Sequence, residues 1–257
     1  MSGFVPASVL ITGATGGIGS ALAEAYAAPG VELILHGRNE ALLGELAARC
    51  GARGARVRTQ VLDVRDRAAL RAWLADLGAQ VPIDLAFVNA GVNTNIGPQG
   101  EGERWEAVEG LIEVNVLAAF AAVDALLPAM RARRRGQIAL ISSLAAYYGL
   151  PVTPSYCASK AALKAYGEAI RGWLAPEGIG VSVVMPGYVE SRMCREMPGP
   201  KPFLWTAGRA ARAIKLGLEK NPARLSFPFP LNLGTWFLAV LPSGISQRLV
   251  RLMGYAG

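Results

Sequence analysis

Short apolar runs of strand length alternate along this chain with longer segments of helical periodicity. Runs such as Ile138-Ala139-Leu140-Ile141 are apolar at every position, which predicts strands buried on both faces and therefore a parallel sheet. We expect strands near 8–12, 32–36, 56–62, 84–89, 137–142, 180–185 and 223–227, and helices near 18–28, 40–50, 66–77, 104–131, 155–174 and 206–219. This order predicts a doubly wound α/β fold of about seven strands, with ligands at the carboxyl ends of the strands. No linker or repeat interrupts it, so one domain over residues 1–257 is expected.

A glycine-rich turn joins the first predicted strand to the first helix. It reads Thr12-Gly13-Ala14-Thr15-Gly16-Gly17-Ile18-Gly19. Glycines let the backbone approach an anion, and the free N–H groups and dipole of the following helix stabilise its charge. The turn therefore predicts a pyrophosphate site. Its spacing is not GxGxxG, and an ordinary strand-to-helix turn stays open as the alternative.

Tyr156 and Lys160 stand four residues apart, and Ser143 precedes the tyrosine by thirteen. On a helix the phenol and the ammonium share one face. Their ordinary pKa values are about 10 and about 10.4, and a fixed ammonium would lower the tyrosine pKa toward neutrality. A serine hydroxyl could then hold a carbonyl or alcohol oxygen beside the phenol. Taken alone, such a pair is also common on exposed helices.

These motifs together resemble the short-chain dehydrogenase/reductase (SDR) family, in its shorter branch. The resemblance is ordered and covers roughly residues 8 to 192. It is carried by TGATGGIG at 12–19, Asn89-Ala90-Gly91, Asn115, Ser143, YCASK at 156–160 and Pro186-Gly187. The resemblance implies a single-domain Rossmann fold and a nicotinamide-dependent oxidoreductase that interconverts a carbonyl and an alcohol.

The resemblance also implies roles for four residues. Tyr156 would be the acid/base, and Ser143 would orient the substrate oxygen. Lys160 would hold the nicotinamide ribose and depress the tyrosine pKa. Asn115 would anchor a water on the proton path, with an ordinary helical asparagine as the alternative.

The second predicted strand ends in Leu35-His36-Gly37-Arg38-Asn39. Folds that prefer NAD place an acidic residue here for the ribose hydroxyls, whereas an arginine accommodates the 2′-phosphate of NADP. Gly37 occupies the acidic position, and the Arg38 guanidinium can bind phosphate in a bidentate manner. NADP(H) is therefore favoured over NAD(H); a solvated loop arginine is the alternative.

By resemblance, other positions complete the nucleotide site. Asp63 would accept from the adenine amine, and Ser191 stands where the family usually has threonine, with the hydroxyl retained. The predicted cofactor residues are Gly13, Thr15, Gly16, Gly17, Ile18, Gly19, Arg38, Asn39, Asp63, Val64, Asn89, Ala90, Gly91, Tyr156, Lys160, Pro186, Gly187, Val189 and Ser191.

The resemblance thins after Ser191, where such proteins cover their substrate. Residues 192–205 hold three prolines and several large apolar side chains, which predicts a lid with an apolar underside. These side chains predict a bulky, apolar carbonyl substrate; the alternative is that they only pack on the sheet. The predicted substrate residues are Ala145, Tyr148, Tyr188, Met193 and Trp205.

The C-terminal part of the segment 192–257 is uncharged and aromatic. No charge occurs from Leu225 to Gln247. The length approaches the ~20 residues of a membrane span, but prolines and a glycine interrupt it. A final strand and a short apolar helix covering the pocket or a subunit interface are favoured. Shallow membrane attachment, helped by Arg248 and Arg251, stays open.

Composition narrows the class of protein. Hydrophobic residues at 52% and charged residues at 18% argue against disorder. The net charge of +7 reflects arginines such as those at 131–135, whose lack of interleaved aromatics favours a solvated helix end over a nucleic-acid site. Three scattered cysteines and one histidine, His36, predict reduced thiols, no metal site and no Ser-His-Asp triad.

Three expectations concern context. Residues 1–12 lack a signal peptide's basic start, so a cytoplasmic protein is expected. The resemblance implies a homodimer or homotetramer. Two other functions remain: a nucleotide-binding regulator or scaffold without turnover, and a lyase or epimerase using the same Tyr/Lys pair.

Overall fold

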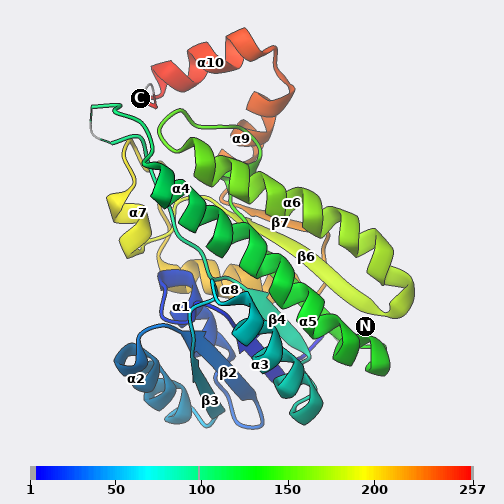
Figure 1. Cartoon of the computed structure of the whole chain (residues 1–257). Coiled ribbons are helices and arrows are strands. Elements are labelled where there is room, and N and C mark those ends of the chain that lie inside the picture. The colour runs from blue at the N-terminus through cyan, green and yellow to red at the C-terminus, as the bar shows by residue number, and fades with distance from the viewer. Residues whose placement is uncertain (1–3, 98, 256–257) are drawn as a thin grey trace.

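The computed structural model describes residues 4–97 and 99–255 and contains one parallel sheet (Figure 1). Its seven strands follow the order β3-β2-β1-β4-β5-β6-β7, which is the predicted doubly wound arrangement. The strands are β1 Ser8–Ile11, β2 Glu32–Gly37, β3 Arg56–Val61, β4 Leu85–Val88, β5 Gly136–Ile141, β6 Ile179–Pro186 and β7 Arg224–Phe227. All seven predicted strands are therefore confirmed.

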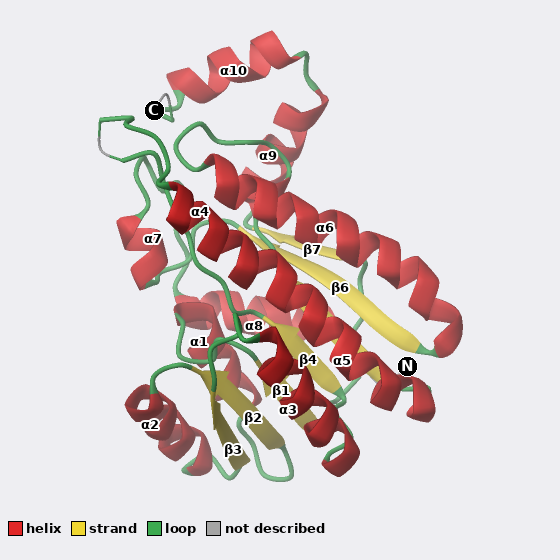
Figure 2. Ribbon diagram, viewed as in Figure 1, coloured by secondary structure: helices red, strands yellow, loops and turns green. Residues whose placement is uncertain are grey.

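Helices cover both faces of the sheet (Figure 2). They are α1 Gly17–Tyr26, α2 Glu40–Gly51, α3 Arg67–Gln80, α4 Trp105–Ile112, α5 Ala118–Arg133, α6 Pro154–Leu174, α7 Arg192–Glu196, α8 Ala207–Leu218, α9 Leu231–Val240 and α10 Ser243–Leu252. In Figure 1, α9 and α10 lie together at one end of the molecule, beyond the sheet.

The pleat of the strands divides the core into two layers. Side chains such as Leu10 and Ile34 pack with α3, α5 and α6 on one face. Their neighbours along the strands, such as Val9 and Leu33, pack with α1, α2 and α8 on the other. Successive side chains of a strand point to opposite faces, so runs that are apolar at every position fill both layers.

Four details differ from the sequence-based expectations. The strand β3 is exposed at most positions, because it is the edge of the sheet. The single helix expected over 104–131 is divided by a π-helical turn, Glu113–Leu117, into α4 and α5. The short helix α7 was not predicted, and the C-terminal segment forms two helices after β7 rather than one.

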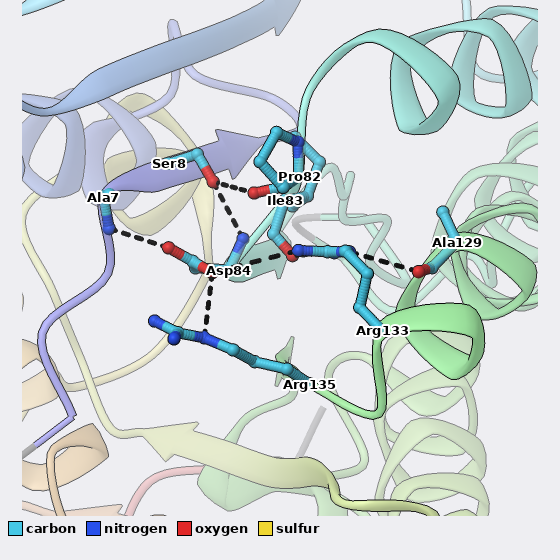
Figure 3. A network of polar contacts seen from close by, with 8 residues as sticks. All are labelled: Ala7, Ser8, Pro82, Ile83, Asp84, Ala129, Arg133 and Arg135. Atoms are coloured by element: carbon cyan, nitrogen blue, oxygen red, sulfur yellow. Dashed lines mark hydrogen bonds and ion pairs between the residues drawn. The ribbon is translucent and has the colours of Figure 1, made fainter.

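Asp84 holds together several chain segments at the amino ends of β1 and β4 (Figure 3). Its carboxylate accepts from the Ala7 amide at 2.9 Å and pairs with Arg135 at 3.3 Å and Arg133 at 4.0 Å. Its amide donates to the Ser8 hydroxyl at 2.9 Å. Asp84 is buried. Its contacts connect the first strand to the end of α5, far from the carboxyl ends of the strands.

Candidate active site

The glycine turn after β1 leaves an open helix N-terminus. No side chain caps α1, and its first turn has no acidic residue. Gly13 has a φ of 65°, and a Cβ there would lie 2.8 Å from the Ala90 Cα. A Cβ on Gly17 would lie 2.8 Å from the Glu190 carbonyl oxygen and from the Ser191 Cβ. The cradle therefore excludes side chains and fits a pyrophosphate.

Side chains from β1 and β4 fix this cradle. The Thr12 hydroxyl accepts from the amides of Asn89 and Ala90, at 2.9 Å and 3.1 Å. The Asn89 side-chain amide donates to the carbonyl oxygens of Thr12 and Gly13, at 2.9 Å and 3.1 Å. The Asn89-Ala90-Gly91 motif thus holds the glycine turn against the adjacent strand.

His36 contacts the glycine turn through Gly13, a role that sequence reasoning did not find. The ring is buried, stacks on Trp73, and lies 3.1 Å from the Leu62 carbonyl oxygen through Nε2. The Gly13 amide donates to Nδ1 at 3.4 Å. Burial lowers the His36 pKa, in keeping with a neutral ring that accepts at Nδ1. A position two residues before Arg38 gave no signal of this contact.

Ser143, Tyr156 and Lys160 meet at the carboxyl ends of β4 and β5. The residues Tyr156 and Lys160 lie on α6, and the Lys160 Nζ lies 5.5 Å from the centre of the Tyr156 ring. Ser143 begins the turn after β5, and its hydroxyl accepts from the Ala145 amide at 3.1 Å. Burial raises the Tyr156 pKa, and interaction with the Ser143 hydroxyl offsets part of that rise. The three side chains predicted to form the catalytic group are therefore close together.

The protonation behaviour of the pair differs from the expectation. Burial dominates and raises the Tyr156 pKa to about 12. Burial also lowers the Lys160 pKa to about 8, and the Nζ donates to the Ile141 carbonyl oxygen at 2.9 Å. The net shift of the Tyr156 pKa is thus upward rather than the predicted lowering, because burial disfavours the charged phenolate.

Asn115 lies in the π-helical turn between α4 and α5 and is fully buried. Its amide nitrogen donates to the Val92 carbonyl oxygen at 2.9 Å and to the Ser159 hydroxyl at 3.0 Å. Its amide oxygen accepts from the Val92 amide at 2.8 Å. Both donor hydrogens go to protein groups. The side chain therefore clamps the loop after β4 to α6.

The end of β2 presents a basic side chain to solvent. Gly37 is buried, and a Cβ there would lie 3.3 Å from the Thr15 side chain. Arg38 is exposed and has no ion pair among the described residues, while Asn39 caps α2 by accepting from Leu42 at 3.0 Å. No carboxylate occupies position 37, so the site has the charge that suits a phosphate.

Asp63, the predicted adenine contact, follows β3 and is bound by Arg65. The two side chains pair at 2.6 Å, and the Arg65 amide donates to the same carboxylate at 3.0 Å. These contacts, with the charge of Arg38 as a smaller cause, lower the Asp63 pKa. Val64 beside it is buried in the core against α3 and α5, so its side chain packs rather than faces a ligand.

The segment after β6 closes over the glycine turn. Gly187 donates to the Phe227 carbonyl oxygen at 2.7 Å, which joins β6 to β7. Val189 is buried and pairs with Trp205 in an isolated bridge. Ser191 caps α7 by accepting from the Cys194 amide at 3.0 Å. Of the predicted cofactor residues in this segment, Ser191 lies beside Gly17.

A cavity of about 680 Å³ opens between the loop after Ser143, the start of α6 and α10, and Ser143, Tyr156 and Lys160 are not among the residues that line it. Ala145 and Tyr148, two predicted substrate residues, line it, together with Cys157, which follows Tyr156 in sequence. The α10 side contributes Gln247, Val250 and Arg251.

The other predicted substrate residues do not line this cavity. The Tyr188 hydroxyl lies 2.6 Å from the Tyr255 hydroxyl, which donates to the Pro200 carbonyl oxygen at 2.6 Å. Met193 is half-buried on α7. Trp205 stacks on Phe227 with 5.0 Å between ring centres and packs against the sheet.

Glu103 is a further residue that sequence reasoning missed. Its carboxylate accepts from the Ser155 amide at 3.1 Å and from the Ser155 hydroxyl at 2.5 Å. It therefore satisfies the first turn of α6, the helix that carries Tyr156 and Lys160. A residue so distant in sequence from Ser155 gives no local pattern that would have indicated the contact.

Comparison with known proteins shows the family. The model of the short chain dehydrogenase family matches residues 7–200. An uncharacterized oxidoreductase of Myxococcus xanthus is 35% identical over 250 residues, which cover 95% of this chain and 96% of the relative. The chain is a member of the short-chain dehydrogenase/reductase family, and the family resemblance expected from the sequence is confirmed.

Solved structures of the family resemble the chain over most of its length. A short-chain dehydrogenase from Sphingobium yanoikuyae in complex with NADPH has a TM-score of 0.80 at 25% identity and covers 97% of both chains. A 3-oxoacyl-[acyl-carrier protein] reductase with bound NAD from Brucella melitensis has a TM-score of 0.72 at 25% identity and covers 85% of this chain and 88% of its own. The chain is thus an oxidoreductase of a family that uses nicotinamide nucleotides, and these relatives bind either form.

Proposed function

We propose that the chain is an NADP(H)-dependent oxidoreductase that interconverts a carbonyl and an alcohol on a bulky, apolar substrate, with Tyr156 as the acid/base. The observation that carries the proposal is the meeting of Ser143, Tyr156 and Lys160 beside the glycine cradle. The nucleotide, when bound, supplies the hydride chemistry. The side chains supply orientation and a proton.

The proton transfer is assigned to the phenol. With its pKa raised to about 12, Tyr156 is neutral at pH 7 and can donate to a carbonyl oxygen. The Ser143 hydroxyl orients that oxygen. Lys160 would hold the nicotinamide ribose; its side chain is buried, and a Cβ on Gly91 would lie 3.4 Å from its Nζ.

The preference for NADP(H) rests on the end of β2. Gly37 leaves no carboxylate to bind ribose hydroxyls, and Arg38 is exposed beside it. The relative from Sphingobium yanoikuyae with bound NADPH supports this choice, while the relative from Brucella melitensis with bound NAD does not.

The substrate class follows from the cavity. Ala145, from the loop that follows Ser143, lines the cavity, as does Cys157 of α6, the helix that carries Tyr156. Its volume of about 680 Å³ is within the usual range of roughly 300–1,000 Å³ for small-molecule sites. Its lining includes Tyr148, Leu150 and Val250. A large, mainly apolar carbonyl compound fits this lining.

We also propose that the chain assembles as a homodimer through α4, α5 and α6. Trp105, Leu117 and Trp173 are exposed large apolar side chains on or between these helices. Burying them against a second copy would remove apolar surface from water. Sedimentation velocity tests this, and a monomer at all concentrations would contradict it.

The activity is tested with a panel of ketones, aldehydes and alcohols while NADPH absorbance is followed. For a responsive substrate, Tyr156→Phe should lower kcat by about a hundredfold or more, because general acid catalysis contributes on that scale. NADPH binding should remain, since only a hydroxyl is lost. Lys160→Ala should damage both binding and rate.

Tyr166→Phe is the matched control. Tyr166 lies on the same helix but stacks on Phe120, with 3.9 Å between ring centres, so its loss of a hydroxyl should leave turnover unchanged. Near wild-type turnover in Tyr156→Phe would reject the mechanism. NADPH binding without consumption across the whole panel would favour a regulator or scaffold instead.

A further inference from the structure

The outer face of the two C-terminal helices is apolar and exposed. We call α9, α10 and the residues between them, 231–252, the C-terminal hairpin. On α9 the exposed apolar residues follow helical spacing on one side, and a second such row follows on α10. The two rows are Leu233, Trp236, Phe237 and Val240, and Ile245, Leu249 and Leu252.

A different set of side chains attaches the hairpin to the rest of the protein. Leu238 and Val250 are buried with Val152, and Tyr148 packs against the same cluster. The Ser246 hydroxyl donates to the Leu238 carbonyl oxygen at 2.8 Å and joins the two helices. Since the inner face already supplies the packing, the outer rows are free for another contact.

The charge around the outer face has one sign. After Glu219 the chain has no Asp or Glu, whereas Arg248 and Arg251 are exposed on α10. A second copy related by a two-fold axis would place this surface against itself, with arginines facing arginines and no carboxylate from either hairpin. An anionic surface is the charge complement that these helices lack.

The hairpin can lie on a bilayer but cannot cross one. Each helix has 10 residues. At about 1.5 Å per residue, this is roughly half of the ~30 Å hydrocarbon core. Of the described residues, only Trp105–Arg133 is long and apolar enough to span a membrane, with a mean hydropathy of 1.8. Half of that window is buried, and its α5 part packs against α3 and the sheet.

We propose that the outer face of the C-terminal hairpin docks on an anionic lipid bilayer. The apolar rows enter the boundary between headgroups and acyl chains, and Arg248 and Arg251 contact the acidic headgroups. Aromatic residues such as Trp236 suit this depth, because an amphipathic ring is stable at the headgroup level.

The test is cosedimentation of the full-length protein with vesicles. Wild type should bind vesicles of phosphatidylcholine mixed with phosphatidylglycerol, bind pure phosphatidylcholine at least tenfold more weakly, and release as salt is raised. The double variant Leu233→Gln, Phe237→Gln should bind the anionic vesicles at least roughly tenfold more weakly than wild type, because its apolar anchors are lost. The double variant Arg248→Gln, Arg251→Gln should lose affinity by roughly tenfold or more for the anionic vesicles, and its affinity for pure phosphatidylcholine should not change.

Leu216→Gln is the matched control. Leu216 is 64% exposed, against 53% for Leu233, but it lies on α8 outside the hairpin. Its variant should bind like wild type. All changed side chains are exposed, and circular dichroism checks that each variant is folded. Equal binding to both kinds of vesicle, no binding, or undiminished binding of the Leu233/Phe237 variant would overturn the proposal. A dimer that this double variant dissociates, without vesicle binding, would also overturn it and assign the surface to a second copy.

Discussion

Lys160 should destabilise the protein that it serves. Its side chain is 4% exposed, and its ammonium donates a hydrogen bond to the Ile141 carbonyl oxygen at 2.9 Å. Burial lowers its pKa from 10.5 to about 8. At pH 7 the group is charged in both the folded and the unfolded chain. Folding therefore transfers a charge out of water, and Lys160→Met should remove that cost.

The size of the effect follows from the pKa. A shift from 10.5 to about 8, at about 1.4 kcal/mol per unit, corresponds to about 3 kcal/mol. The variant loses one hydrogen bond, a loss of about 1 kcal/mol. At pH 7, Lys160→Met should therefore raise the free energy of unfolding by about 2 kcal/mol, because methionine also fills the space.

The pH dependence gives the sharper test. The folded pKa lies below the unfolded value, so the unfolded chain binds more protons between about pH 8 and pH 10.5. The penalty is fully present below about pH 8 and disappears as pH rises through this window. The stability gap between variant and wild type should therefore shrink toward about pH 10.

Urea unfolding of both proteins at a series of pH values measures this gap. Lys220→Met makes the same substitution at an exposed lysine and controls for the general loss of a positive charge. A Lys160→Met protein that is less stable than wild type at pH 7 would refute the reasoning. A gap that stays constant across the window would refute it as well.

Three other predictions concern the nucleotide site and the frame. In titration calorimetry, Arg38→Ala should weaken NADPH binding by about 1.5–3 kcal/mol and leave NADH binding little changed. The control variant Arg49→Ala, remote from the site, should change the binding of neither nucleotide. Equal affinity of the wild type for both nucleotides would contradict the assignment. Asp84→Ala should lower the free energy of urea unfolding by about 1–3 kcal/mol, but Asp124→Ala, whose exposed ion pair is shorter at 2.7 Å, should lower it by less than about 1 kcal/mol. Gly17→Ala should abolish nucleotide binding, since its Cβ meets backbone at 2.8 Å; retained affinity would show that the loop yields.

Features with a local cause could be predicted from the sequence. Strands such as β5 are apolar at every position, and the glycine turn follows from the short run 12–19. Parallel strands bring their carboxyl ends to one edge, so the fold alone placed Asn89 and Ser143 near Gly13. The edge strand β3 was also predicted from the sequence. It is stabilised by its pairing with β2 rather than by burial.

Features made by distant pairs could not be predicted in the same way. Glu103 and Ser155 are 52 residues apart, and Tyr188 and Tyr255 are 67 residues apart. Nothing in either segment alone indicates its partner. Asn115 shows a subtler limit, because the motif marked the position while its side-chain contacts depend on how a π-helical turn packs on α6. The same reason explains Trp205, whose apolar character fits both a pocket and a sheet.

The protonation states of Tyr156 and Lys160 bear on the proton-transfer step of the proposed reaction. A tyrosine with a pKa near 12 is a proton donor at pH 7, and reduction of a carbonyl needs a donor. Oxidation of an alcohol needs the phenolate, which burial of Tyr156 disfavours. The cation that could stabilise a phenolate, Lys160, is itself less readily charged because burial lowers its pKa to about 8. Both shifts have the same cause, so the buried pair favours a neutral phenol at pH 7, the form that would donate the proton in a reduction.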